Sequence, residues 1–112
     1  MTREQAQNAI VTAVPPEFRR TAVAYIAEGS CAAGEVLSLD RQDYTCRQPM
    51  FLGFIDLDSG RNWGHACLYV LCHQSGGVET RPGMFPPALT GDRRLVAISA
   101  GEAAPDWAIA RR

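Results

Sequence analysis

The stretch from Gly64 to His73, GHACLYVLCH, restricts the fold of this chain more than any other segment. Both of its alternating faces are apolar, which does not suit a strand that turns one face to solvent. We therefore expect a strand in the interior of a sheet, with His65 at its start. The segment from Met50 to Asp58, MFLGFIDLD, predicts a second strong strand. Residues 58–62 between the two segments have the composition of a turn.

Three weaker strand signals surround this pair. Residues 35–40 and 95–99 are short apolar runs that indicate strands. Residues 78–81 are typical of an edge strand that ends at Pro82. The segment from Gly83 to Asp92, which contains two adjacent prolines, is expected to be a loop.

The first thirty residues have the period of helices instead. Thr2 and Gln5 resemble a capping box, and Ala6, Ile10 and Val14 then repeat on one helical face. A second helix is expected to begin at Pro15-Pro16 and to end at Gly29. Its apolar face would carry Phe18, Ala22, Tyr25 and Ile26.

These patterns predict an α+β fold with two N-terminal helices packed on a mainly antiparallel sheet of about four to five strands. The length of 112 residues suits a single domain over 1–112. Residues 1–29 would be helical, 35–100 β-rich, and 101–112 a tail.

Composition and charge exclude several classes of protein. The chain is 46% hydrophobic and 21% charged, as in a soluble globular protein, and it has no apolar run long enough for a membrane span. Its net charge is -1 and its arginines are scattered, which argues against a nucleic-acid partner. The N-terminus has no signal-peptide pattern, so a cytoplasmic location is expected. All 11 basic residues are arginine, which suggests a bacterial source with GC-rich DNA.

The four cysteines are Cys31, Cys46, Cys67 and Cys72. Their even number permits two disulfides, but reduced thiols are the default without a secretion signal. No pair of cysteines or histidines has the spacing of a zinc site, and Cys46, His65 and Cys67 would have to converge from separate segments to hold a metal. We expect no metal and no cofactor, and we expect Cys67 and Cys72 to be core residues.

A cysteine–histidine catalytic pair is one hypothesis for function. Cys31, which follows Gly29-Ser30 at an expected helix-to-strand junction, or Cys46, beside Arg47 in an expected polar loop over residues 43–47, would be the nucleophile. His65 would be its base. Glu79 or Asp56 would orient the imidazole.

A short resemblance to known enzymes accompanies this hypothesis. The segment from Trp63 to Val70, followed by a Gly-Gly turn and Val78-Glu79, resembles the histidine strand and hairpin of papain-like hydrolases of the cell-wall-amidase class. Gly29-Ser30-Cys31 ahead of a strand is similar to the nucleophile region of chemotaxis-type glutamine deamidases. Both resemblances imply a cysteine-dependent hydrolase or deamidase, and neither assigns the chain to a family.

Loop aromatics support a different hypothesis, in which the protein binds a partner without catalysis. Trp63, Phe85 and Trp107 lie in expected loops or in the tail, where exposed aromatics can mark an interaction surface. The chain would then be a small immunity-, adaptor- or inhibitor-like module, or part of a homo-oligomer. This binding module is our first prediction, and the cysteine-dependent enzyme is the alternative. Asp56 and Asp58, on one strand face, fit either acid–base work or a solvated surface.

Overall fold

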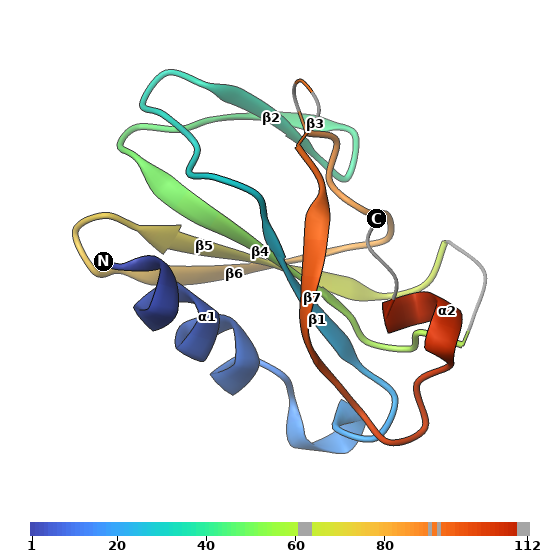
Figure 1. The fold of residues 1–112 in the computed structure, drawn as a ribbon. Coiled ribbons are helices and arrows are strands. Elements are labelled where there is room, and N and C mark those ends of the chain that lie inside the picture. The colour runs from blue at the N-terminus through green and yellow to red at the C-terminus, as the bar shows by residue number, and fades with distance from the viewer. Residues whose placement is uncertain (61–63, 90, 92, 110–112) are drawn as a thin grey trace.

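The computed structural model describes residues 1–60, 64–89, 91 and 93–109. The chain begins with a helix and continues mostly as strands (Figure 1). Its elements are α1 (Arg3–Thr12), the 3-10 turn η1 (Pro16–Phe18), β1 (Val23–Ala27), β2 (Val36–Leu39), β3 (Gln42–Thr45), β4 (Met50–Asp56), β5 (Cys67–His73), β6 (Val78–Gly83), β7 (Leu95–Ala100) and the single-turn helix α2 (Asp106–Ile109).

Five strands form one antiparallel sheet in the order β6-β5-β4-β1-β7. The strand β5 lies between β4 and β6, so the apolar run in it is interior, as the sequence predicts. The strands β2 and β3 form a separate two-stranded hairpin. In the described part of the chain, β6 and β7 each pair on one side only and are the edges of the main sheet.

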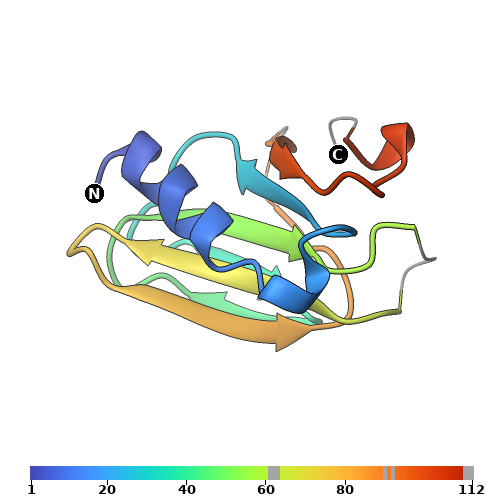
Figure 2. The same cartoon turned by 90° about the horizontal axis from the view of Figure 1, so that it is seen from below.

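The two faces of the main sheet are covered differently (Figures 1 and 2). The helix α1 lies on one face, over a cluster that includes Ile10, Ile26 and Val70. The β2–β3 hairpin lies on the other face, over a cluster that includes Leu37 and Phe54. Every residue of β1 is buried, because this strand crosses the sheet between both clusters.

The first helix agrees with its sequence signals. The side chain of Thr2 accepts a hydrogen bond from the backbone N–H of Gln5, and the side chain of Gln5 accepts one from the backbone N–H of Thr2. Ala6 and Ile10 are fully buried against the sheet. Ile10 lies over Gly53 of β4, where a Cβ atom would come within 2.4 Å of the Ile10 Cγ1 atom. The absence of a side chain at Gly53 therefore lets α1 approach β4 closely.

The prediction of two helices on a sheet of four to five strands is wrong, because the described residues form a mainly β fold with seven strands, η1 and one helix longer than a single turn. The expected second helix is replaced by η1 and the central strand β1. Its apolar residues match a helical face, but the run Val23–Ala27 is buried on both sides, and the period of a short apolar run does not distinguish a helix from a strand.

The second correction concerns β3, which the sequence predicts as a polar loop. Leu39 and Gln42 pair directly, so Asp40 and Arg41 form a two-residue turn. Both have positive φ angles, 55° and 67°, as a type I′ hairpin turn requires. Glycine or asparagine usually occupies such positions, and an Asp-Arg pair therefore gives no hairpin signal.

Smaller differences occur at the strand ends. The strand β6 is the expected edge strand, but it continues through Pro82 to Gly83, and β5 begins only at Cys67. The tail contains α2, which is tied to the sheet because the Tyr25 hydroxyl donates a hydrogen bond to the carbonyl oxygen of Ala108. Among the described residues, no helix has the length and apolar character needed to cross a bilayer.

Candidate functional site

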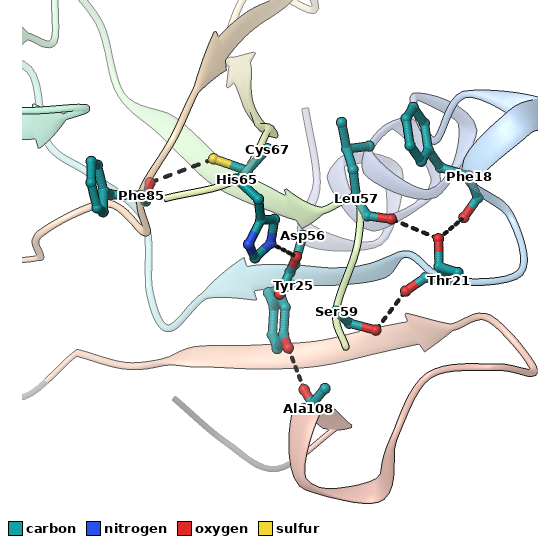
Figure 3. A network of polar contacts seen from close by, with 10 residues as sticks. All are labelled: Phe18, Thr21, Tyr25, Asp56, Leu57, Ser59, His65, Cys67, Phe85 and Ala108. Carbon is teal, nitrogen blue, oxygen red and sulfur yellow. Dashed lines mark hydrogen bonds and ion pairs between the residues drawn. The ribbon is translucent and has the colours of Figure 1, made fainter. Parts of the chain in front are cut away.

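His65 is held by a carboxylate and not by a cysteine. Its Nε2 atom lies 2.6 Å from Oδ1 of Asp56, the last residue of β4 (Figure 3). His65 is 8% exposed and Asp56 is 1% exposed, so the contact is shielded from solvent. The chain reaches His65 just before β5 begins, and Asp56 pairs in register with Cys67. Of the two partners expected for His65, Asp56 makes the contact and Glu79 lies elsewhere, on β6.

Cys67 and Cys72 are core thiols on opposite faces of β5. The Cys67 thiol donates a hydrogen bond to the carbonyl oxygen of Phe85 at 3.6 Å (Figure 3). Burial, reinforced by the negative charges of Asp56 and Asp40, raises the pKa of Cys67 to about 12. Burial also raises the pKa of Cys72. Neither residue therefore carries the thiolate that a nucleophile needs.

Cys31 and Cys46 are brought together, although they come from different connections. Cys31 lies between β1 and β2, at a strand-to-strand connection and not at the expected helix-to-strand junction, and Cys46 directly follows β3. The two thiols lie close enough for the charge on one to affect the other. The Arg93 guanidinium donates to the Cys31 sulfur, at 3.4 Å. Burial nevertheless raises the pKa of both thiols above the ordinary cysteine value.

A cleft of about 690 Å³ opens between the hairpin and the edge of the main sheet. The end of β3 and the residues after it form one wall, and β5 and β6 form the other. Its lining is rich in charged and polar side chains: Asp43, Tyr44, Thr45, Cys46, Arg47, Gln48, His73, Glu79 and Arg81. A volume of this size is typical of ligand sites.

The alternation of β6 explains why these side chains meet. Glu79 pairs with Leu71 and Arg81 pairs with Tyr69, so both lie on the face that the hairpin covers. The hairpin meets this edge through the Tyr44 ring, which contacts Arg81, and the Glu79 and Arg81 side chains line the cleft that remains there. His73, two residues beyond Leu71 on β5, joins them.

Glu79 connects the two basic groups of this wall. Its Oε2 atom accepts a hydrogen bond from Nε of Arg81 at 2.8 Å, and its Oε1 atom lies 3.6 Å from Nε2 of His73. The bond from Arg81 is the main reason why the pKa of Glu79 is lowered. The Nδ1 atom of His73 is buried without a hydrogen-bond partner among the described residues. Glu79 is thus placed to orient His73 and not His65.

Arg81 is fixed on two sides. Its guanidinium lies 4.8 Å from the ring centre of Tyr44, and its Nε atom is bound to Glu79. In the described part of the chain, neither terminal nitrogen of this guanidinium has a hydrogen-bond partner. Such a fixed guanidinium can bind a carboxylate through both terminal nitrogens at little entropic cost. Arg47, which is exposed, adds a second positive charge to the lining.

The three aromatic residues expected to bind a partner have different environments. Trp63 lies outside the described residues. Phe85 is half-buried, with the Arg41 guanidinium 4.5 Å above its ring, and its carbonyl oxygen accepts a hydrogen bond from Tyr69. Trp107, on α2, is 60% exposed. Of the two expected aromatic residues that the structure describes, Phe85 and Trp107, only Trp107 exposes most of its side chain to solvent.

Sequence reasoning named Cys46 and Glu79 only as parts of a pair with His65, and it did not bring them together with Tyr44, His73 and Arg81. The alternation of Glu79 and Arg81 was a usable signal, because it places both on one face of an edge strand. Nothing in the sequence placed Tyr44 beside them, since the hairpin itself gave no signal. Among the described residues, no group of three or more potential metal ligands gathers in one place.

Comparison with known proteins adds no relative. No family model, no curated protein and no solved structure matches this chain. The cleft and the contacts around it are therefore the basis for any functional conclusion.

Proposed function

We propose that this protein is a binding module whose site is the cleft between β3 and β6. Its ligand is an extended segment of a partner protein that carries an acidic side chain. The observation that supports this most directly is Arg81, held by Glu79 and Tyr44 with its terminal nitrogens unoccupied by the described residues.

The backbone of β6 supports an extended ligand. In the described part of the chain, β6 pairs only with β5, and its outer edge is open. A peptide can add to such an edge as another strand, with main-chain hydrogen bonds supplying affinity. Every second side chain of the added strand would then lie on the same face as Arg81. An Asp or Glu at one of these positions could pair with the guanidinium.

Binding accounts for this cleft better than thiol catalysis does. Cys46 lines the cleft, but burial raises its pKa and its thiol lies close to that of Cys31. His65, the expected base, is bound to Asp56 in the interior. The contacts of these groups favour the binding module over the cysteine-dependent hydrolase or deamidase.

The proposal can be tested with a displayed library of random peptides. We expect the selected peptides to be enriched in Asp and Glu and to shift the backbone amide signals of β6 residues in NMR spectra. Arg81→Gln should weaken their binding about tenfold or more, because a charge-assisted hydrogen bond contributes roughly 1.5–3 kcal/mol.

Arg20→Gln is a matched control. Arg20 also donates from Nε to a glutamate, Glu102, at 2.9 Å, but it does not line the cleft. This variant should bind the selected peptides as the wild type does. Peptides without acidic residues, equal losses in both variants, or signal shifts confined to residues away from the cleft would each overturn the proposal.

A further inference from the structure

Cys31 and Cys46 lie close to each other because the backbone holds both at the base of the hairpin. Cys31 exchanges backbone hydrogen bonds with Met50, at 2.7 and 3.0 Å. Cys46 donates from its backbone to Glu35 at 2.9 Å and accepts from Gly34 at 2.7 Å. Both side chains belong to the same buried cluster. Arg93 joins them through Glu35, because it contacts the Cys31 sulfur and the Glu35 carboxylate, and the Cys46 backbone donates to Glu35. The other two cysteines lack this arrangement, since they point to opposite faces of β5.

From this geometry we infer that Cys31 and Cys46 form a reversible disulfide by exchange with a low-molecular-weight disulfide. The two thiols differ in position and in charge environment. Cys46 is 1% exposed and lines the cleft, whereas Cys31 is 0% exposed. Cys31 receives a hydrogen bond from the Arg93 guanidinium. The inference does not depend on which ligand the cleft binds.

These differences set the order of the reaction. The exchange is slow, because burial raises the pKa of Cys46 and keeps most of it protonated. The small thiolate fraction, whose proton has gone to solvent, attacks one sulfur of the small disulfide, which releases the other half as a thiolate. Cys31, as a thiolate beside Arg93, then attacks the Cys46 sulfur of the mixed disulfide. The Cys31–Cys46 bond forms and the second half leaves as a thiolate. Two protein thiols are oxidised and one small disulfide is reduced to two thiols.

Peptide mapping of the wild-type protein tests the inference directly. The probe is excess glutathione disulfide at neutral pH, followed by an acid quench, alkylation and digestion with trypsin. Cleavage after arginine separates Cys31, in residues 21–41, from Cys46, in residues 42–47. Cys67 and Cys72 remain together in residues 62–93, because Pro82 follows Arg81. We expect peptide 21–41 joined to peptide 42–47, with Cys67 and Cys72 alkylated.

Several results would overturn the inference. Cys31 and Cys46 could both remain alkylated after long exposure to the disulfide, or both could end as separate glutathione adducts. Disulfides of Cys67 or Cys72 could form as readily as the Cys31–Cys46 bond. Each of these results is read from the wild-type protein and needs no variant.

Variants test the order of attack. Cys31→Ser should stop the reaction at a stable glutathione adduct on Cys46, and Cys46→Ser should leave Cys31 unmodified. Cys72→Ser, the matched control, should still form the cross-link. Arg93→Gln should slow the second step severalfold, because it removes the positive charge and the hydrogen bond that stabilise the Cys31 thiolate. An adduct on Cys31 in the Cys46→Ser variant would refute the assignment of Cys46 as the first nucleophile.

Discussion

His65 and Asp56 form a polar contact in the interior of the protein. Replacing only one of the two residues there is strongly destabilising. Removing one partner leaves the other without its counterpart in a medium that solvates it poorly. The contact joins the end of β4 to the residue that leads into β5, so it fixes the connection between these two strands. A structural role of this kind needs no cysteine nearby.

For His65→Ala we expect the free energy of unfolding to fall by about 3 kcal/mol, because the Asp56 carboxylate stays buried without its imidazole partner. Urea denaturation measures this change. Arg20→Ala breaks an exposed contact and should cost less than about 1 kcal/mol. A stability loss no larger than that of Arg20→Ala, together with a fall in the iodoacetamide reactivity of one thiol, would instead indicate a catalytic pair.

Single residues also show how far sequence reasoning reached. The sequence of β5 alone is enough to place Cys67, Tyr69 and Leu71 on one face, because side chains in a strand alternate by geometry. Sequence reasoning named both Glu79 and Asp56 as partners of His65 and could not choose between them, because the contact depends on how β4 and β5 are aligned. The sequence of one strand does not determine how that strand is aligned with its neighbour.

Among the elements, α1 and β4 depend on each other most closely at Gly53. A Cβ atom there would lie 2.4 and 2.6 Å from the Cγ1 and Cδ1 atoms of Ile10. Gly53→Ala should therefore lower the free energy of unfolding by about 1–3 kcal/mol, the usual cost of overpacking. The measurement is urea denaturation of the variant and the wild type.

A double-mutant cycle identifies the cause of this loss. In an Ile10→Ala background, Gly53→Ala should cost much less, because the atoms that it would meet are gone. Gly60→Ala is the control, since nothing lies within 4 Å of a Cβ atom there. The close packing of α1 on β4 would be disproved if Gly53→Ala cost the same with and without the Ile10 side chain.

The elements also explain the error in fold class. Residues 18–26 contain apolar residues at helical spacing, but Val23–Ala27 lies between two cores and needs apolar residues on both faces. A short, fully buried strand therefore has the same apolar pattern as part of a helix, and the sequence alone does not distinguish the two. The hairpin was missed for the opposite reason, since β3 contains only one partly buried side chain, Tyr44, in an otherwise exposed strand.

For the whole molecule, the buried thiols predict how stability changes with pH. All four cysteines have pKa values raised above 9.0 in the folded state, and that of Cys67 rises to about 12. Above about pH 9 the unfolded chain loses these protons while the folded chain keeps them. The free energy of unfolding should therefore be fully retained below this pH and fall as the pH rises toward 12, by at most about 1.4 kcal/mol per pH unit for each thiol.

Urea denaturation in the presence of a reductant, at about pH 8 and about pH 10, measures this slope. Cys67→Ala should show a shallower decline than the wild type, although its stability at neutral pH is lower because a cavity replaces the thiol. A free energy of unfolding that is constant or rises over this range would contradict the prediction.

The cleft itself is a property of the whole molecule. It forms where a hairpin from the middle of the chain, lying over one face of the sheet, meets the edge strand β6, which comes later in the sequence. Sequence patterns describe each strand separately and carry little information about where one sheet ends over another. For this reason Cys46 and Glu79 could be named from the sequence, whereas their common environment could not.

The position of β1 also affects how a newly made chain folds. This strand is the first described strand of the sheet in the sequence, but it lies between β4 and β7, and β7 is the last. One edge of this apolar strand therefore stays unpaired on the ribosome until β7 has been made, after every other described strand of the sheet. Late closure of distant strands slows folding and leaves nascent chains open to aggregation. Truncation before Leu95 should thus yield a protein that chaperones retain, even though most of its sheet has already been synthesised.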